Sequence, residues 1–502
     1  MAGLKARLAE IRASPRGRRT GAFFDFDGTL IAGYSGNEFY RARLRAREVG
    51  PGELARTLLA VGDMRLRGAD VEGLMRTAIS VWKGRPVDEM EQLAERLMVQ
   101  RIAGMLYPEA LQLIDAHRQR GHTVVLASSA TRYQVEPLAA ELLIDNILCT
   151  EVEVMNGAFT GELASPVRWG PGKAEAVRDF AGERGLDLAR SYGYGNGDED
   201  EAFLETVGKP RPLNPEPGLA RLARDRDWPV TYLTPRSAGR VRPLLRTGAA
   251  LAGVGAAAFV GVGAGLLNRS RRVAANVAAG VGSDIALALA GVELEVIGEE
   301  HLWSHRPAVF VFNHQSSLDT LVLGSLLRRD FTGIAKKEAA RDPRFAPIGA
   351  LLDVVYIDRA NSAAAREAMR PVVERLRNGT SLAIAPEGTR TPTPRLRPFK
   401  KGAFHVAMQA GVPIVPVVLR NAGQLMWRGE AVVHPGKLQV AVLAPIATDA
   451  WSVEDLNDRV AQVRARFEET LQRWPGEAPN AGRRRRSDGS ARRQPVGARA
   501  AR

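Results

Sequence analysis

The chain has 502 residues, 45% of them hydrophobic and 25% charged, a globular composition with room for two or three domains. Its single cysteine, Cys149, excludes an intramolecular disulfide, and no Cys/His cluster typical of zinc sites occurs in the sequence. The net charge of +14 lies mostly in the tails, because residues 1–20 carry six Lys or Arg against one Glu, and residues 477–502 carry eight Arg against two acids. The nearly neutral body argues against a general nucleic-acid-binding face, whereas basic tails suit an anionic membrane surface, nucleic acid or solvated disorder.

Hydrophobic patterning divides the chain into two large segments with a linker and two tails. In both large segments, strand-like apolar runs alternate with helical stretches, which predicts α/β sheets covered by helices. Ligands of such sheets gather at the carboxyl ends of strands, so polar residues that follow apolar runs are candidate site residues. The five parts are a basic N-terminal arm at 1–20, a first domain at 21–235, an apolar Gly/Ala-rich linker at 236–292, a second domain at 293–475 and a disordered basic tail at 476–502.

The first domain opens with two carboxylates, Asp25 and Asp27, directly after the apolar run 21–24. Gly28 permits a tight turn that can bring both toward one pocket, although this pattern alone would equally suit a calcium loop or an ordinary turn. Three later features of the sequence favour a functional site at these two carboxylates over a calcium loop or an ordinary turn. They are Ser128 after the strand-like run 123–127, Lys173 at the start of a predicted helix, and a carboxylate-rich loop at 195–200.

In this order, the residues resemble the haloacid dehalogenase (HAD) superfamily, in its phosphoserine-phosphatase-like branch (subclass IB), over 21–235. The resemblance implies a Rossmann-like domain in which Asp25 is the nucleophile that forms an aspartyl-phosphate. Asp27 would protonate the leaving oxygen and then activate water, while Ser128 and Lys173 would hold the phosphoryl oxygens. The helical segment at about 34–108 would be the cap that closes over the site.

The same resemblance implies a Mg²⁺ ion bound by Asp25, the backbone carbonyl of Asp27, Asn196 and Asp200. The cation would offset the repulsion between a carboxylate nucleophile and a phosphate. The family pattern has an Asp where this chain has Asn196, whose amide oxygen brings no charge. Asp198 could substitute for it. The departure leaves two alternatives, a Mg²⁺-dependent phosphomonoester phosphatase and an inactive or regulatory domain of the same fold.

The linker contains 22 residues without a charge, from 247 to 268, which is long enough to cross a bilayer. Gly and Ala dominate it, and the spacing of Gly261 and Gly265 is typical of close helix contacts in membranes. A second apolar stretch at 273–291 contains Asp284 and is a poorer span. The pattern predicts a membrane-associated helical linker that either spans the bilayer or lies in its interface.

In the second domain, His314 and Asp319 follow the apolar run 308–312, with Ser316 and Ser317 between them. We expect the imidazole at the end of a buried strand and the carboxylate in the first turn of a helix that the serines cap. A carboxylate there can hold one ring nitrogen and leave the other free to take a proton from a hydroxyl. Taken alone, the pair would equally be a helix cap beside a surface histidine. The serines could also form a covalent acyl-enzyme, although neither lies in a Gly-x-Ser-x-Gly elbow.

Three further blocks follow the pair in order. They are 354–359, which ends in Asp358-Arg359, then 386–390, which contains Glu387, Gly388 and Arg390, and the apolar run 411–417. With the His–Asp pair, they resemble the glycerolipid acyltransferases, specifically the 1-acylglycerol-3-phosphate acyltransferase (PlsC-type) family, over roughly 300–420.

The resemblance implies that His314 is the general base and that Asp319 orients it. The glycerol-phosphate part of the acceptor would be bound by Arg359, Glu387, Gly388 and Arg390, because arginine pairs well with phosphate. Within this set, Glu387 would fix an arginine or the glycerol backbone rather than touch phosphate. The run 411–417 would be an apolar strand that shapes the acyl site.

Together the two resemblances predict a bifunctional, bacterial protein associated with the cytoplasmic face of the cell membrane. The acyltransferase would move a fatty acyl group from acyl-CoA or acyl carrier protein to lysophosphatidate, which gives phosphatidate for phospholipid biosynthesis. The single cysteine fits a reducing, cytosol-facing location, and the abundance of Ala, Gly and Arg suits a GC-rich bacterial source. Two alternatives stand beside it, a phosphatase with a lipid-anchoring C-terminal half and a non-catalytic membrane scaffold. No specific nucleic-acid partner is expected.

Overall fold

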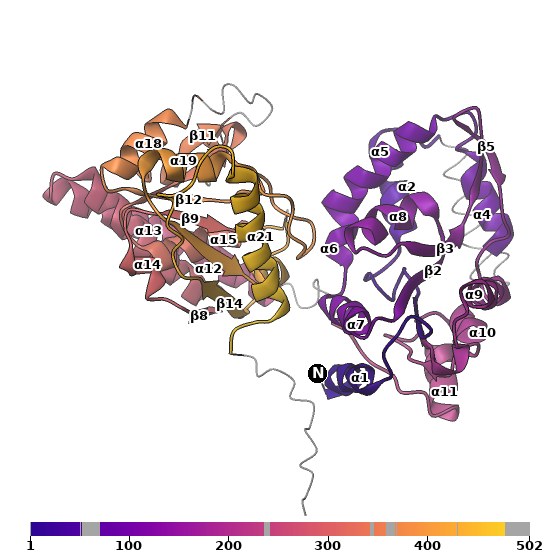
Figure 1. The fold of residues 1–502 in the computed structure, drawn as a ribbon. Coiled ribbons are helices and arrows are strands. Elements are labelled where there is room, and N and C mark those ends of the chain that lie inside the picture. Colours follow the sequence, from indigo (N-terminus) through magenta and orange to yellow (C-terminus); the bar gives the residue numbers. More distant parts are fainter. Residues whose placement is uncertain are drawn as a thin grey trace, which may run out of the picture.

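The computed structural model contains two α/β units that are joined by a pair of long helices (Figure 1). It describes residues 2–50, 52, 71–234, 241–341, 346–357, 367, 369–428 and 430–476. The predicted α/β class and the apolar helical linker are therefore confirmed.

A five-stranded parallel sheet, in the order β3-β2-β1-β6-β7, forms the centre of the first unit. All four residues of β1 are buried, as expected for a strand of a parallel sheet that is covered on both faces. The strands are β1 (Gly21–Phe24), β2 (Thr123–Thr131), β3 (Asn146–Thr150), β6 (Tyr192–Tyr194) and β7 (Lys209–Pro210), and a separate antiparallel pair consists of β4 (Val152–Met155) and β5 (Ala158–Leu163).

Helices cover this sheet, and several of them fall between β1 and β2, where the cap was predicted. Residues 51 and 53–70 of the predicted cap lie outside the described residues. The helices of this unit are α1 (Ala2–Ala13), α2 (Ser35–Arg45), α4 (Val71–Ser80), α5 (Val87–Leu97), η1 (Met98–Ile102), α6 (Ala103–Met105), α7 (Pro108–Gln119), α8 (Arg132–Glu141), α9 (Pro171–Arg184), η2 (Leu188–Arg190), η3 (Asp198–Asp200), α10 (Glu201–Leu204) and α11 (Pro217–Asp225).

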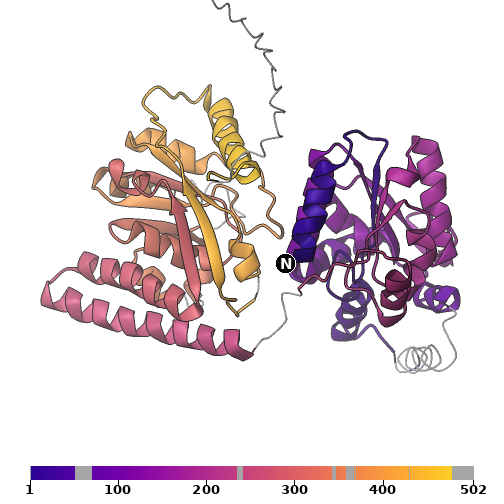
Figure 2. The same cartoon turned by 90° about the horizontal axis from the view of Figure 1, so that it is seen from below.

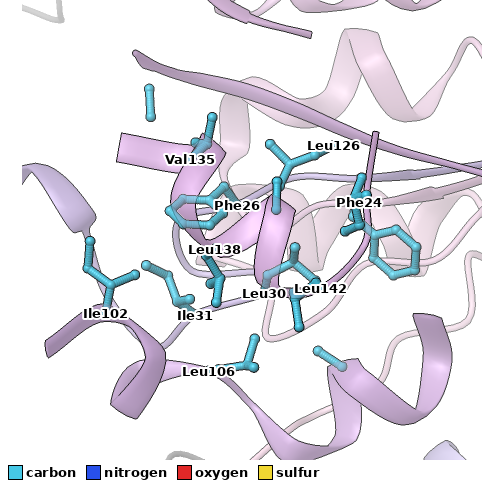
Figure 3. Packing of buried hydrophobic residues seen from close by; sticks show 14 of the residues in the cluster. Phe24, Phe26, Leu30, Ile31, Ile102, Leu106, Leu126, Val135, Leu138 and Leu142 are labelled. Carbon is cyan, nitrogen blue, oxygen red and sulfur yellow. The ribbon is translucent and has the colours of Figure 1, made fainter. Parts of the chain in front are cut away.

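The main core of the first unit lies between the sheet and the helices that pack on it. Phe24 and Leu126 come from the neighbouring strands β1 and β2, and Leu138 and Leu142 come from the region of α8 (Figure 3). Leu106 from the end of the predicted cap joins the same cluster. The cap segment and the sheet therefore share one hydrophobic core.

The predicted basic arm at 1–20 is mostly a helix that packs on the first unit. Ile11 of α1 is 1% exposed and belongs to the main core cluster. Glu10 forms an ion pair with Arg211, next to β7. The basic charges of this segment had obscured the apolar face that docks α1 on the domain.

The linker forms two antiparallel helices, α12 (Val241–Leu267) and α13 (Arg271–Ala290), which run along one edge of the second unit in pink in Figure 2. Each is long and apolar enough to cross a membrane by length and composition. A Cβ added to Gly261 would lie 2.8 Å from the carbonyl oxygen of Ala274, and one added to Gly265 would lie 2.6 Å from the Cβ of Ala274. The predicted close helix contact at these glycines is therefore confirmed.

Helix α13 is fastened to the second unit, whereas α12 keeps an exposed apolar face. Asp284 of α13 accepts a hydrogen bond from the Ser325 hydroxyl at 2.5 Å and pairs with Arg328 at 2.8 Å. Large apolar side chains of α12 that remain exposed are Val241, Leu244, Leu245, Leu251, Phe259, Val260, Val262, Leu266 and Leu267.

A seven-stranded sheet, in the order β11-β10-β12-β9-β13-β14-β8, forms the centre of the second unit. The strands from β11 to β13 run parallel, and β14 runs antiparallel to β13. The strands are β8 (Val292–Ile297), β9 (Val309–Phe312), β10 (Phe331–Lys336), β11 (Val355–Ile357), β12 (Ser381–Ile384), β13 (Ile414–Leu419) and β14 (Gly436–Val442). The helices are α14 (His301–Ser304), α15 (Leu318–Leu327), η4 (Lys337–Arg341), α16 (Ala346–Leu351), α18 (Arg370–Arg377), α19 (Gly402–Ala410), α20 (Ala422–Leu425) and α21 (Leu456–Gln472).

Candidate active sites

His314 follows the central strand β9, and Asp319 lies in the first turn of α15, as the sequence predicts. Nδ1 of His314 lies 2.8 Å from Oδ2 of Asp319. The same carboxylate oxygen accepts hydrogen bonds from the backbone N–H groups of Gln315 and Ser316, at 2.8 and 3.0 Å. The side chain of Asp319 is fully buried at 0% exposure, and that of His314 is 21% exposed. The imidazole is thus oriented through Nδ1, and Nε2 has no hydrogen-bond partner within the described residues.

Glu387 comes directly after β12, the strand beside β9, and holds the backbone of the histidine. One carboxylate oxygen accepts the N–H of His314 at 2.8 Å, and the other accepts the N–H of Arg397 at 2.8 Å. The N–H of Thr391 donates to the carbonyl of His314 at 2.8 Å. Burial raises the pKa of Glu387 to about 7. The expected contact of Glu387 with an arginine side chain is replaced by a contact with an arginine backbone, so this residue fixes the loop that carries the base.

The remaining residues of this block form a turn that places Arg390 beside the histidine loop. Gly388 has a φ of +74°, and a Cβ there would lie 3.1 Å from Cε of Lys400, so glycine suits the position. Nη1 of Arg390 donates to the Ser317 hydroxyl at 2.5 Å. Burial lowers the pKa of Arg390, although Asp319 opposes the shift. The positive charge of Arg390 therefore lies next to the loop between base and orienting acid.

Arg359, the other predicted arginine, lies outside the described residues, as does the whole stretch 358–366. Arg428, which was not predicted from the sequence, lies next to Arg390. Its Nη1 donates to the carbonyl of Arg390 at 2.7 Å, and burial together with Arg390 and Arg397 lowers the pKa of Arg428. The sequence offered no signal for Arg428, because it follows α20 rather than a recognised block.

Sequence reasoning also missed the polar residues that lock the histidine loop to the end of β13. The side chain of Asn313 donates to the carbonyl of Leu419 at 2.8 Å and accepts from its N–H at 2.7 Å. The hydroxyl of Ser316 donates to the carbonyl of Met426 at 2.6 Å. Ser317 occupies the N-cap position of α15 but makes no side-chain cap bond, so the predicted cap is wrong for this serine. The sequence did offer one signal for these contacts, because the amide residues Asn313 and Gln315 flank His314 at the end of a strand.

In the first unit, Asp25, Lys173 and Asp200 meet in a buried cluster. Asp25 follows β1, and Lys173 lies in the first turn of α9 at 2% exposure. Nζ of Lys173 lies 2.9 Å from Oδ1 of Asp25 and 2.6 Å from Oδ1 of Asp200. Burial raises the pKa of Asp25 to about 7, although Lys173 opposes the shift. The two carboxylates outweigh burial at Lys173 and hold its pKa above the ordinary value, so the ammonium stays charged.

Asp27 faces the start of α2 rather than the lysine. Its two oxygens accept hydrogen bonds from the N–H and the hydroxyl of Ser35, at 2.6 and 3.1 Å. Burial raises the pKa of Asp27 to about 6, although the two bonds from Ser35 oppose the shift. Gly28, with a φ of +78°, provides the predicted turn after the two acids. Asp27 is therefore held by the first helix of the predicted cap.

Ser128 lies on β2, in the part of that strand that extends past the end of β1. It is buried, and its hydroxyl accepts the N–H of Ala130 at 3.1 Å. The strand runs to Thr131, with a register shift after Ala127, and so is longer than the predicted 123–127. The topology brings Ser128 to the sheet edge that carries Asp25.

The loop after β6 gives each of its polar residues a different partner. Oδ1 of Asn196 accepts a hydrogen bond from the Thr29 hydroxyl at 3.0 Å. Oδ2 of Asp200 accepts the N–H groups of Asn196 and Gly197, at 3.0 and 3.2 Å. Asp198 accepts the N–H of Leu219 in α11 at 2.6 Å, which directs its carboxylate to that helix. This contact argues against Asp198 as a substitute for the acid that Asn196 replaces.

Two family models match the chain, one in each unit. Residues 22–205 match the haloacid dehalogenase-like hydrolases, and residues 293–420 match the acyltransferases. The "Inhibition of morphological differentiation protein" of Streptomyces azureus is 34% identical over 270 residues, which are 52% of this chain and 96% of that protein. An "Uncharacterized acyltransferase" of Schizosaccharomyces pombe is 35% identical over 190 residues, which are 37% of this chain and 68% of that protein. The chain is a haloacid dehalogenase-like hydrolase joined to an acyltransferase.

A further relative concerns the acyltransferase domain. The 1-acyl-sn-glycerol-3-phosphate acyltransferase of Limnanthes alba is 38% identical over 180 residues, which are 35% of this chain and 62% of that protein. The match therefore covers about three-fifths of the length of that enzyme.

The hydrolase domain offers oxygen donors that fit a divalent cation, as its family generally requires. The buried carboxylates of Asp25 and Asp200 share the ammonium of Lys173, and the carboxylate of Asp27 is held nearby by Ser35. Burial raises the pKa values of Asp25 and Asp27. Asp25, the carbonyl of Asp27 and the amide oxygen of Asn196 suit Mg²⁺, which prefers oxygen ligands. Both oxygens of Asp200 are already engaged. Among the described residues, no group of three or more His, Cys, Asp or Glu forms a metal cluster, in keeping with the neutral amide at Asn196.

The two domains touch through the loops of the acyltransferase site. Trp427 is 7% exposed and packs with the core cluster of the hydrolase domain, where a Cβ on Gly104 would lie 2.6 Å from its Nε1. The hydroxyl of Thr393 donates to Glu141 at 2.8 Å. The loop that carries Arg390 and the loop that holds Ser316 are therefore both in contact with the hydrolase domain.

Proposed function

We propose that the acyltransferase domain transfers a fatty acyl group from acyl-CoA or acyl carrier protein to the free hydroxyl of lysophosphatidate, which gives phosphatidate. The observation that carries the proposal is the 2.8 Å contact of Nδ1 of His314 with Asp319, which leaves Nε2 available, while Arg390 is bonded to Ser317 in the same loop. The similarity to the Limnanthes alba enzyme supports the choice of substrate.

The reaction follows from these positions. Asp319 accepts the Nδ1 proton, so Nε2 can take the proton of the acceptor hydroxyl. The hydroxyl oxygen attacks the thioester carbonyl, a C–O bond forms, the C–S bond breaks, and the sulfur leaves with the proton from Nε2. Arg390, together with Arg359, pairs with the acceptor phosphate, and Gly388 allows the turn that places it. Glu387 and Thr391 hold the histidine backbone during the reaction.

Neither serine is needed as a nucleophile in this scheme. The hydroxyl of Ser316 donates to the carbonyl of Met426, and that of Ser317 accepts from Arg390. Both hydroxyls therefore support the site, and the lipid hydroxyl attacks directly.

For the hydrolase domain we propose a Mg²⁺-dependent phosphomonoester phosphatase. Asp25 attacks the phosphorus, the ester oxygen leaves with a proton from Asp27, and Asp27 then activates the water that releases phosphate. Lys173 and Ser128 bind phosphoryl oxygens, and Asp200 holds Lys173 and the loop of Asn196. Mg²⁺, held by Asp25, the Asp27 carbonyl and Asn196, supplies the positive charge that lets a carboxylate approach a phosphate.

The amide at Asn196 favours a second candidate for this domain, an inactive or regulatory one. An amide oxygen can bind Mg²⁺ but contributes no charge, and affinity for hard cations depends on the charge of the ligands. Activity toward phosphomonoesters at a physiological Mg²⁺ concentration distinguishes the two candidates.

We also propose that the helices α12 and α13 lie in the membrane interface at the cytoplasmic face of a bacterial membrane. Hydrogen bonds and ion pairs of Asp284 tie α13 to the acyltransferase domain, which disfavours insertion of that helix across the bilayer. The exposed apolar side chains of α12, among them Phe259 and Leu267, suit the acyl region below the headgroups. The basic tail at 477–502 lies outside the described residues and adds attraction to anionic lipid.

Two full-length variants test the proposal, with labelled acyl-CoA and a panel of phosphomonoesters in detergent with Mg²⁺. We expect His314→Ala to abolish acyl transfer and to retain phosphatase activity, and Asp25→Asn to do the reverse. Each variant is the control for the other. Full acyl transfer by His314→Ala would overturn the acyltransferase proposal, and an inactive wild type in both assays would favour a membrane scaffold.

A further inference from the structure

A cavity of about 560 Å³ lies between the two domains, and both domains contribute to its walls. One wall consists of Arg390 and Arg428 of the acyltransferase domain. The other wall belongs to the hydrolase domain and consists of Gln92, Glu95, Arg96, Val99 and Gln100. These five residues occupy positions i, i+3, i+4, i+7 and i+8 along α5 and η1, so they form one face of a continuous helical segment.

The charges that line the cavity suit an anion. Three arginines and a single glutamate face it, together with two glutamines. Arg428 donates to the carbonyl of Arg390, and burial together with Arg390 and Arg397 lowers its pKa, so this wall carries two guanidinium groups. Arg96 is exposed on the opposite wall, and no hydrogen bond or ion pair engages it within the described residues. Guanidinium groups on two sides of a space are a suitable arrangement for a phosphate.

The cavity adjoins the histidine of the acyltransferase site. Arg390 lines the cavity and at the same time donates to the hydroxyl of Ser317, in the loop between His314 and Asp319. Arg390 therefore links the cavity to the loop that carries His314. The volume has room for a phosphate with a small polar group attached to it.

The helix wall is held against the acyltransferase domain on two sides. Trp427, the neighbour of Arg428, packs against Gly104 in α6, which directly follows η1. The hydroxyl of Thr393 and the guanidinium of Arg395 donate to Glu141 and to the carbonyl of Ala140, at 2.8 and 3.3 Å. Contacts of Trp427 with α6 and of Thr393 and Arg395 with α8 thus hold the two domains together.

We propose that the hydrolase domain completes the substrate site of the acyltransferase, with Arg96 on the α5–η1 wall binding a phosphate of an acyl-transfer substrate opposite Arg390 and Arg428. The inference rests on the proposed acyl transfer and goes beyond it, because it gives the hydrolase domain a role in the other domain's reaction. The phosphate belongs either to the acceptor lipid or to the pantetheine-bearing donor.

Charge reversal at Arg96 in the full-length chain tests the proposal, with steady-state acyl transfer as the measurement. Arg96 is exposed, so Arg96→Glu is expected to fold normally. We expect this variant to raise KM for the phosphate-bearing substrate by about tenfold or more and to leave kcat within about twofold, because a charge-assisted contact is lost and His314 is untouched. Arg101→Glu is the matched control, since Arg101 is exposed on the same helical segment and does not line the cavity.

Two phosphate-free substrates identify which phosphate is bound. 1-Monoacylglycerol replaces the lysophosphatidate acceptor, and an acyl thioester of N-acetylcysteamine replaces the acyl-CoA donor. The KM effect of Arg96→Glu should disappear with one of these analogues and persist with the other. Loss of the effect with monoacylglycerol assigns the cavity to the acceptor, and loss with the short thioester assigns it to the donor.

Equal kinetics of Arg96→Glu and Arg101→Glu would overturn the inference, as would a KM effect that both phosphate-free analogues retain. A fall in kcat alone at saturating substrates would also overturn it. These outcomes differ from those that would overturn the proposed acyl transfer itself. In that case, wild type would transfer no acyl group, or His314→Ala would keep full activity.

Discussion

The carboxylate of Glu387 accepts a hydrogen bond from the backbone N–H of His314, at 2.8 Å across 73 residues of sequence. Its other oxygen accepts the N–H of Arg397, which begins the return of the chain toward α19. Glu387, at the start of the turn 386–390, thereby fixes the backbone of His314, the proposed general base. The block 314–319 and the block 386–390, which are separate in the sequence, are joined by these hydrogen bonds in the fold.

The raised pKa of Glu387 predicts how stability changes with pH. A folded-state pKa of about 7 exceeds the ordinary 4.5, so the contribution of Glu387 is fully present below about pH 4.5 and is lost as the pH rises through 7. The change across this window is at most roughly 3 kcal/mol. At pH 5 the protonated carboxyl of Glu387 resembles the amide of Glu387→Gln, which does not titrate. We therefore expect the two proteins to have similar melting temperatures at pH 5 and wild type to lose stability relative to the variant toward pH 8. A difference that does not vary with pH would contradict the assignment.

Asp319→Asn should reduce kcat for acyl transfer by roughly 10³-fold and leave both KM values nearly unchanged. An amide at this position cannot accept from Nδ1 of His314 and from two backbone N–H groups as a carboxylate oxygen does, so the required tautomer is lost. Steady-state kinetics and melting temperature are the measurements. A variant that stays folded and loses only substrate affinity would assign Asp319 to binding instead.

Direct attack by the lipid hydroxyl predicts that no acyl-enzyme forms on the serines. Ser317→Ala should keep kcat within a few-fold, since its hydroxyl supports Arg390 but not the base. Ser316→Ala should lose about 1 kcal/mol of stability, because its hydroxyl bonds to Met426 and Leu318 are removed, but it should remain active. Mass spectrometry of wild type quenched during turnover should show no acyl adduct at either residue.

Asn196→Asp should increase the affinity of the hydrolase domain for Mg²⁺ by about tenfold, because it adds a charge to the ligand set. The measurement is the Mg²⁺ concentration that gives half of the thermal stabilisation, which does not depend on turnover. Asp198→Asn is the control, since Asp198 caps the N–H of Leu219 and should alter stability without changing the Mg²⁺ midpoint. An unchanged midpoint in Asn196→Asp would remove residue 196 from the proposed ligands.

Lys173→Met should destabilise the hydrolase domain by about 3–5 kcal/mol, because it leaves the buried carboxylates of Asp25 and Asp200 without their cation. The loss should shrink at low pH, where Asp25 can take a proton. Urea denaturation followed by circular dichroism measures the effect, and the exposed Lys83→Met serves as the control.

The parts of both sites that follow from local sequence could be predicted. His314 and Asp319 lie where a buried strand ends and a helix begins, and Lys173 lies at a helix start after a Gly-Pro-Gly turn. The contacts that join distant segments could not be predicted, because no local pattern encodes them. Asn313 meets Leu419 across 106 residues, and Trp427 meets Gly104 across the two domains.

The basic charge of the N-terminal segment also led to a prediction that missed its packing. The first twenty residues carry six basic side chains, which suggested an arm, yet Ile11 lies in the core of the hydrolase domain. A helix needs only a few apolar residues on one face to dock, and a net charge does not reveal that face.

Helix α15 carries Asp319 at its start and packs on α13 so closely that a Cβ on Gly324 would collide with the hydroxyl of Ser283. Helix α13 in turn pairs with the apolar α12, so packing contacts link the hairpin to the helix that carries Asp319. On the proposed placement of the hairpin in the membrane interface, the imidazole is held at a defined height above the lipid. Such an enzyme would discriminate by depth, because a hydroxyl that lies deeper or shallower in the bilayer would not reach hydrogen-bonding distance of the base. Selection among lipids then depends on where a hydroxyl resides in the membrane as well as on the groups attached to it.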